Sequence, residues 1–222
     1  MKNIARNFLM IDIPLLLMMG QVLVEIFVPN TEKAAFHSEG GPHEAIEAFF
    51  LVFAFPVALF LTFKVKNFWL KIWAGIAALC CFYVAGEEIS WGQQIFHWGT
   101  PENWAAINDQ NETNLHNTST WLDQKPRAIL EIGVLIGGLI IPALRKWKPE
   151  RLPQRFKEIY PGNIVVFTAI CAVIVKLIGI YGDTTGHHLF WRVSEVMELY
   201  LYYFVLLYLI DRKFSWKEQG LI

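Results

Sequence analysis

Six apolar segments, each of the ~20 residues that an α-helix needs to cross a bilayer core, constrain this chain more than any other feature. The composition agrees, because 55% of the 222 residues are hydrophobic and only 18% are charged. We therefore predict an all-α fold, a polytopic transmembrane helix bundle that forms one domain over residues 1–222. Its six predicted spans are Phe8–Val28, Glu44–Phe63, Phe68–Gly86, Ala128–Leu144, Ile164–Tyr181 and Leu189–Ile210.

The lysines and arginines of the short loops predict how these spans are oriented. Cytoplasmic loops of membrane proteins are enriched in both residue types. With six spans, four basic segments fall on one side of the membrane. They hold Lys2, Arg6, Lys64, Lys66, Lys71, Arg145, Lys146, Lys148, Arg151, Arg155, Lys157, Arg212, Lys213 and Lys217. We predict that both termini are cytoplasmic and that the protein is a multi-pass protein of a bacterial inner membrane.

The loop at residues 87–127 is the one long segment on the predicted periplasmic side. Thr100, Pro101 and Glu102 are typical of a helix start, with a hydroxyl cap, a proline and then an acid near the positive end of the helix dipole. Tryptophans in this loop suit the membrane interface. We therefore expect short helices on the outer membrane surface, and this loop is also the expected contact for a protein partner.

Acids and histidines gather on the same predicted outer side. All six histidines lie there, at positions 37, 43, 97, 116, 187 and 188. Charged side chains within a bilayer need a partner or a wet cavity, so this bias predicts a polar cavity that opens outward. Glu44 with Glu47, and Glu195 with Glu198, form ExxE pairs that share a helix face. Lys176 and Arg192 are available to neutralise neighbouring acids.

The predicted site combines acids at the end of the third span with residues of the outer loop and the sixth span. Glu87 and Glu88 form its helix-borne end, and the segment Trp98–His116 covers it and brings His116 back over the two acids. His188, Arg192 and Glu195 would share one helix stripe at i, i+4 and i+7. Acids and histidines on facing helices can hold a divalent metal such as zinc.

This arrangement predicts a role for each residue of the site. The predicted metal ligands are Glu88, His116, His188 and Glu195. The predicted catalytic residues are Glu87 and Glu88, as general base, together with Arg192, which would orient a carboxylate or phosphate group. Alternatively, the paired carboxylates would act as acid and base without a metal.

Two stretches of the chain resemble known membrane proteins. Gly86–Gln94 (GEEISWGQQ) and Asn108–Asn117 (NDQNETNLHN) resemble a signature of bacterial multi-pass inner-membrane proteins, a resemblance that implies no established activity. The adjacent Glu87 and Glu88 are similar to the paired glutamates of CAAX-type intramembrane proteases, with Gly92 in place of the arginine of the EExxxR pattern. The outward acids, histidines and serine are similar in kind to ceramidase-like membrane hydrolases, which use zinc. No catalytic residue is carried over from either family.

These patterns favour a metal-dependent hydrolase or transferase that acts on a lipid or lipid-linked substrate. Membrane lipid is the expected partner, and nucleic acid is not expected. Two other functions stay open. In a cation- or proton-coupled transporter, the ExxE pairs and Lys176 would form the relay. In a non-enzymatic assembly protein, the outer loop would bind a protein partner.

Overall fold

The computed structural model of this chain describes residues 3–36, 40–108 and 111–222, and over these ranges it is an all-α bundle without strands. His37, Glu39 and Asp109 lie outside the described residues. Within the described ranges, six helices are long and apolar enough to cross a membrane, which confirms the predicted six-span class. They are Ile4–Phe27, Pro42–Lys64, Phe68–Glu88, Gln124–Trp147, Asn163–Thr185 and Val193–Glu218.

Most spans are single helices, but the first and fourth each contain a π-helical turn, at Phe8–Asp12 and Ile136–Ile140. In chain order the α-helices are α1 (Asn3–Asn7), α2 (Ile13–Phe27), α3 (Asn30–Phe36), α4 (Pro42–Lys64), α5 (Phe68–Glu88), α6 (Gln93–Phe96), α7 (Glu102–Ala105), α8 (Thr120–Leu135), α9 (Ile141–Trp147), α10 (Val166–Thr185) and α11 (Val193–Glu218). The predicted short helices of the outer loop are therefore α6 and α7.

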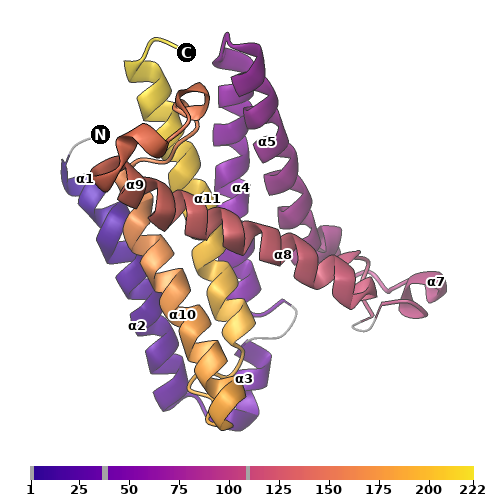
Figure 1. Cartoon of the computed structure of the whole chain (residues 1–222). Coiled ribbons are helices and arrows are strands. Elements are labelled where there is room, and N and C mark those ends of the chain that lie inside the picture. The colour runs from indigo at the N-terminus through magenta and orange to yellow at the C-terminus, as the bar shows by residue number, and fades with distance from the viewer. Residues whose placement is uncertain (1–2, 37–39, 109–110) are drawn as a thin grey trace.

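The helix α1 and the C-terminus lie at the same end of the bundle as the turn between α4 and α5 and as α9 (Figure 1). We call this the basic end, because it carries the lysines and arginines of the short loops. The α3 helix and the connection from α10 to α11 lie at the opposite, outer end (Figure 1). This grouping agrees with the predicted topology. The assignment of the basic end to the cytoplasm stays a prediction from the charge distribution.

The last helix, α11, forms the centre of the bundle. Tyr200, Tyr203 and Leu207 on this helix are at most 1% exposed. The hydroxyl of Tyr200 donates to the carbonyl of Pro14, and that of Tyr203 donates to the carbonyl of Leu9. Backbone carbonyls within a bilayer need such partners, because no water reaches them there. The two tyrosines therefore attach α11 to the first span where its helix is irregular.

The fourth span, α8 to α9, crosses the other helices obliquely (Figure 1). It packs closely on α10 at Gly138, where an added Cβ would lie 2.3 Å from the Cβ of Ala169. Nearer the outer end, Lys176 of α10 forms an ion pair of 2.9 Å with Glu131 of α8, which confirms the predicted neutralising role of Lys176. The oblique crossing leaves space between α8 and the helices α5 and α11, and that space holds the candidate site.

Candidate metal centre and its cavity

A cavity of about 220 Å³ lies where α5, α8, α11 and the outer loop meet. Its walls carry an unusual density of charge for the interior of a membrane bundle. The acids that line it are Glu44, Glu87, Glu88, Glu195 and Glu198, and the basic residues are His116, Arg127 and Arg192. On one side it is bounded by apolar residues of α8, among them Leu122 and Leu130. The cavity is therefore lined mainly by polar groups, and α8 contributes both apolar residues and Arg127 to its wall.

Three carboxylates from three different helices converge beside this cavity, and two of them, Glu88 and Glu198, line it. Within the residues that the structure describes, Glu47 of α4, Glu88 of α5 and Glu198 of α11 form a cluster whose ligand oxygens all lie within 4.8 Å of one another. We call these three residues the glutamate triad. Oxygen ligands around a divalent cation lie about 2.0–2.6 Å from it, so two of them are separated by at most about 5 Å. The triad therefore has the spacing of a cation site.

Two members of the triad are held in place by donors. The hydroxyl of Tyr202 donates to Oε1 of Glu88 over 2.9 Å. The guanidinium of Arg127 donates to Oε1 of Glu198 over 2.7 Å, and this contact is also an ion pair. Both acids line the cavity and are at most 9% exposed. These contacts fix the direction in which each carboxylate points, as outer contacts do for metal ligands.

Glu47 has no such support. Its side chain is 0% exposed, and neither of its carboxylate oxygens accepts a hydrogen bond from any described residue. An ionised carboxylate that is buried without a partner costs several kcal/mol, and two further carboxylates close by add repulsion. Either a cation or shared protons must therefore offset this cost. Glu47 is the side chain whose environment most clearly lacks a positive partner.

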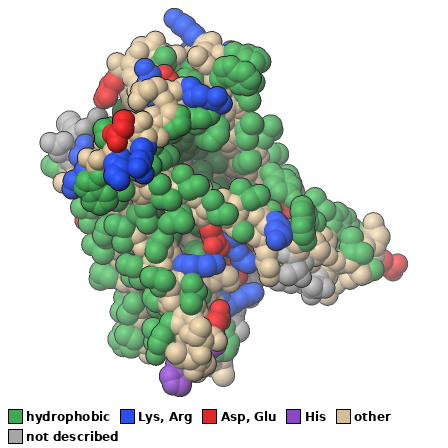
Figure 2. Space-filling model, viewed as in Figure 1, with side chains coloured by type: hydrophobic (Ala, Val, Ile, Leu, Met, Phe, Trp, Pro, Cys, Tyr) green, Lys and Arg blue, Asp and Glu red, His purple; other side chains and the backbone are tan. Residues whose placement is uncertain are grey.

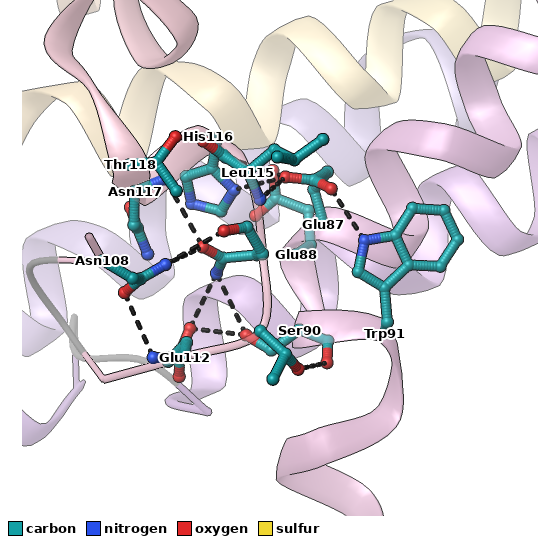
Figure 3. A network of polar contacts seen from close by, with 12 residues as sticks. Glu87, Glu88, Ser90, Trp91, Asn108, Glu112, Leu115, His116, Asn117 and Thr118 are labelled. Carbon is teal, nitrogen blue, oxygen red and sulfur yellow. Dashed lines mark hydrogen bonds and ion pairs between the residues drawn. The ribbon is translucent and has the colours of Figure 1, made fainter. Parts of the chain in front are cut away.

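The neighbouring Glu87 is, by contrast, fully occupied by the outer loop. Oε1 accepts a hydrogen bond of 2.7 Å from the indole N–H of Trp91. Oε2 accepts from the backbone N–H groups of Leu115 and His116, at 2.7 and 2.8 Å (Figure 3). Nδ1 of His116 lies 3.5 Å from the same oxygen. As the sequence predicted, His116 returns over Glu87, and the contacts make Glu87 an anchor for the loop.

The chain leaves α5 through a strained turn that presents these groups. Ser90 and Trp91 have φ values of 46° and 54°, which residues other than glycine seldom adopt. Each such residue costs on the order of 1–3 kcal/mol and persists only when its surroundings enforce it. Trp91 folds back over Gly86, where an added Cβ would lie 2.8 Å from its ring. The glycine therefore makes room for the indole that reaches Glu87.

A second polar network holds the loop against this turn. The hydroxyl of Ser90 donates to Oε2 of Glu112 over 2.5 Å, and the amide of Asn114 donates to the same oxygen over 2.8 Å (Figure 3). Asn108 in turn donates to Oδ1 of Asn114 over 2.9 Å. Asn114 and Ser90 are both 0% exposed. Asn108 and residues 111–117 therefore form part of a folded cover that contacts the end of α5.

The predicted hydroxyl cap at Thr100 was wrong. The helix α7 begins at Glu102, close to the predicted start, but no side chain caps it. The hydroxyl of Thr100 instead donates to the carbonyl of Asn111 and accepts a hydrogen bond of 2.7 Å from Gln93. The hydroxyl of Thr100 therefore connects Gln93 with Asn111 and is not available to cap the short helix α7.

The structure brings five of the six predicted site residues around the cavity: Glu87, Glu88, His116, Arg192 and Glu195. Arg192 lies 3.6 Å from Glu195, so it neutralises this acid at the mouth of the cavity. His188 is not a lining residue and packs instead over Gly182 at the end of α10. The predicted stripe of His188, Arg192 and Glu195 does not form, because α11 begins only at Val193.

No family model, curated protein or solved structure matches this chain. The geometry of the site is therefore the basis for its interpretation. Glu47 and Glu198 belong to the two ExxE pairs of the sequence, but neither is among the predicted ligands. Arg127 and Tyr202, which hold two members of the triad, are not among the predicted site residues either. The one signal for the triad was the repeated ExxE spacing, which placed an acid one turn deeper than Glu44 and Glu195.

Proposed function

We propose that this protein is a divalent-cation-dependent hydrolase or transferase that acts on the phosphate-containing head group of a lipid or lipid-linked substrate. The observation that carries the proposal is the glutamate triad next to a cavity lined by two arginines and a histidine. The triad would supply the cation site, the basic residues contacts for an anionic group, and Leu122 and Leu130 of α8 apolar contacts. We further propose that the protein works in a bacterial inner membrane, with this cavity on the periplasmic side.

The chemistry of the ligands favours a hard cation. All the triad ligands are carboxylate oxygens, which Mg²⁺, Mn²⁺ and Ca²⁺ prefer, whereas zinc sites usually include histidine or cysteine. The zinc expectation depended on His116 and His188. His116 is engaged with Glu87, and His188 lies over Gly182. Magnesium or manganese is therefore the better match to this site than zinc.

The size and lining of the cavity support a head group as the reacting part of the substrate. Its volume of about 220 Å³ is below the ~300–1,000 Å³ of pockets that enclose a whole drug-sized ligand. Arg127 of α8 and Arg192, which directly precedes α11, both line it, and arginine suits phosphate because its planar guanidinium donates two parallel hydrogen bonds. The acyl chains of such a substrate would remain in the bilayer beside Leu122 and Leu130.

His116 is placed to transfer a proton at this cavity. It lines the cavity, and the carboxylate of Glu87 lies 3.5 Å from its Nδ1, which orients the ring. In hydrolysis, the oxygen of water bonds to phosphorus and releases a proton to solvent, the P–O bond to the leaving group breaks, and the leaving oxygen takes up a proton. We assign that proton to His116. The cation would polarise a phosphoryl oxygen and stabilise the charge that develops there.

The interior of the bundle favours this reaction over cation transport. A relay would need polar groups to continue from the triad towards the basic end. Past the triad, the buried positions of α4 that the structure describes are all apolar: Ala48, Phe50, Leu51, Ala54, Ala58 and Leu61. Those of α11 are mostly leucine and aromatic residues, and their polar groups include the tyrosine hydroxyls and Arg212. The protein partner predicted for the outer loop stays a prediction.

Turnover of lipid in vesicles tests this function. The purified protein is incubated with vesicles of total bacterial inner-membrane lipid, with Mg²⁺ or Mn²⁺ or with EDTA, and products are followed by phosphorus NMR and mass spectrometry. We expect a new phosphorus-containing product only when the cation is present. The substitution His116→Gln should slow its formation by about 100-fold or more, as loss of a general acid does.

The control for this assay is Glu102→Gln, because Glu102 is exposed on α7 and distant from the triad in its contacts. It should leave the rate unchanged. A wild-type protein that binds the cation but forms no product from any lipid of the extract would contradict the proposed activity. A product that forms equally in EDTA would contradict the role of the cation.

A further inference from the structure

A second and larger cavity, of about 680 Å³, lies at the basic end of the bundle, away from the glutamate triad. It is bounded by the N-terminal helix, the end of α9, the loop 148–162 and the last turns of α11. Figure 2 shows lysine and arginine side chains gathered on the surface at this end. The basic residues that line the cavity are Arg6, Arg145, Lys157 and Arg212. The proposed function uses none of them.

The wall of this cavity is firmly attached to α11. Arg212 donates to the carbonyl of Glu158 over 2.8 Å, and the indole of Trp216 donates to the same carbonyl over 2.8 Å. The backbone N–H of Gly162 donates to Oδ2 of Asp211 over 2.7 Å. Arg212 and Trp216 are at most 4% exposed. The loop 148–162 is therefore a fixed wall, and the cavity it encloses is preformed.

The charges around this cavity do not balance. Four basic residues face it, and the acids that face it are Asp211 and Glu218. Asp211 already pairs with Arg212, and Lys157 lies 3.9 Å from Glu158 just outside the lining. Among the described residues, neither Arg6 nor Arg145 forms an ion pair, although Arg145 donates to the carbonyl of Pro161 over 2.8 Å. The guanidinium groups of Arg6 and Arg145, which come from different spans, are both exposed and line this cavity. They give the cavity a net positive charge.

The spans also contribute apolar residues to the lining, among them Met10, Ile164 and Phe214, beside polar residues such as Ser215. A ligand with an anionic group and an apolar part would match both sides. Arginine pairs bind phosphate with particular strength, because each guanidinium offers a planar set of donors. Anionic lipids are also enriched at the cytoplasmic surface, where the basic end is predicted to lie.

We propose that this cavity is a binding site for an anionic phosphate group, held by Arg6 and Arg145, of either a lipid head group or a soluble phosphate compound. The site is separate from the glutamate triad in residues and in charge. It links the first span to the end of the fourth span, so occupancy would hold these two spans together at the basic end. The proposal does not depend on the proposed enzymatic activity.

Two binding measurements on the full-length protein in neutral detergent test this site. Native mass spectrometry measures retention of phosphatidylglycerol against phosphatidylcholine, and equilibrium dialysis measures binding of inorganic phosphate. The test variant is Arg6→Gln with Arg145→Gln. The control variant is Lys64→Gln with Lys71→Gln, which removes the same charge from exposed positions at the same end outside the cavity.

We expect the arginine variant to weaken binding of at least one probe by about tenfold or more, the loss expected for removing charge-assisted hydrogen bonds. The lysine variant should bind as the wild type does. Loss for phosphatidylglycerol alone assigns the site to a lipid, and loss for inorganic phosphate assigns it to soluble phosphate compounds. Equal effects of the two variants, or no binding of either probe by the wild type, would overturn the proposal. Unchanged unfolding temperatures confirm that both variants are folded.

Discussion

Replacing Glu47 by glutamine is expected to make the metal-free protein more stable and, at the same time, insensitive to divalent cations. Glu47 is 0% exposed, has no hydrogen-bond donor among the described residues, and lies beside Glu88 and Glu198. An ionised carboxylate buried without a partner destabilises the fold, so removing its charge should raise the free energy of unfolding. The new amide can also donate to the two remaining carboxylates. The same change removes one of the three ligands.

Thermal unfolding in detergent, in EDTA and in Mn²⁺, measures both effects. The wild type should unfold at a higher temperature in Mn²⁺ than in EDTA, because a bound ion stabilises the folded state. Glu47→Gln should unfold above the wild type in EDTA and show no gain in Mn²⁺. The matched control is Glu131→Gln, because Glu131 is an acid of α8 that pairs with Lys176 outside the triad. This control should keep the response to Mn²⁺. A Glu47→Gln protein that is less stable in EDTA would contradict the account.

Replacing Glu87 by alanine is expected to release the outer loop from the end of α5. Its two carboxylate oxygens accept hydrogen bonds from Trp91, Leu115 and His116. Each buried donor that loses its acceptor costs about 1–3 kcal/mol, so the combined loss exceeds what a short loop can compensate. Hydrogen exchange at residues 111–118 should accelerate by about 100-fold or more, since that factor corresponds to ~3 kcal/mol. Lipid turnover should fall with it, because His116 loses its position.

The comparison of Glu87→Ala with Glu87→Gln and Glu102→Ala separates this role from a general loss of stability. Glutamine keeps one oxygen that can accept from the backbone of residues 115 and 116, so its exchange rates should be intermediate. Glu102→Ala removes an exposed acid of α7 and should leave exchange at residues 111–118 as in the wild type. Wild-type exchange in Glu87→Ala would show that the loop is held elsewhere, most directly by Glu112 and Ser90.

The fold followed closely from the sequence because bilayer thickness sets the length of each span. The turn from α4 to α5, for example, falls between Lys64 and Phe68, as the charges and apolar runs predicted. The start of the last helix, α11, differs from the prediction, because it lies at Val193 and not at Leu189. Gly186 ends α10 with a φ of 74°, and the chain needs the residues up to Arg192 to turn back. Because His188 lies in that turn, the helical spacing assumed for it does not apply.

The site followed only in part, because its central contacts join separate helices. The return of His116 to Glu87 could be predicted, since one loop connects them and its polar composition suited a cover. The triad could not, because Glu47, Glu88 and Glu198 are far apart in sequence and meet only through the packing of α4, α5 and α11. The sequence also concealed that Glu87 and Glu88, although adjacent, face different partners. Glu87 contacts the loop, whereas Glu88 accepts a hydrogen bond from Tyr202 and forms the triad with Glu47 and Glu198.

Electron paramagnetic resonance of Mn²⁺ added to the purified protein tests the central claim most directly, because the signal of free Mn²⁺ is lost when the ion binds. For the wild type, we predict titration to one bound ion per protein. Glu198→Gln should leave the added Mn²⁺ free, and Glu131→Gln should bind it as the wild type does. A wild-type protein that leaves all the Mn²⁺ free, or a Glu198→Gln protein that binds it equally well, would contradict a cation site at the glutamate triad.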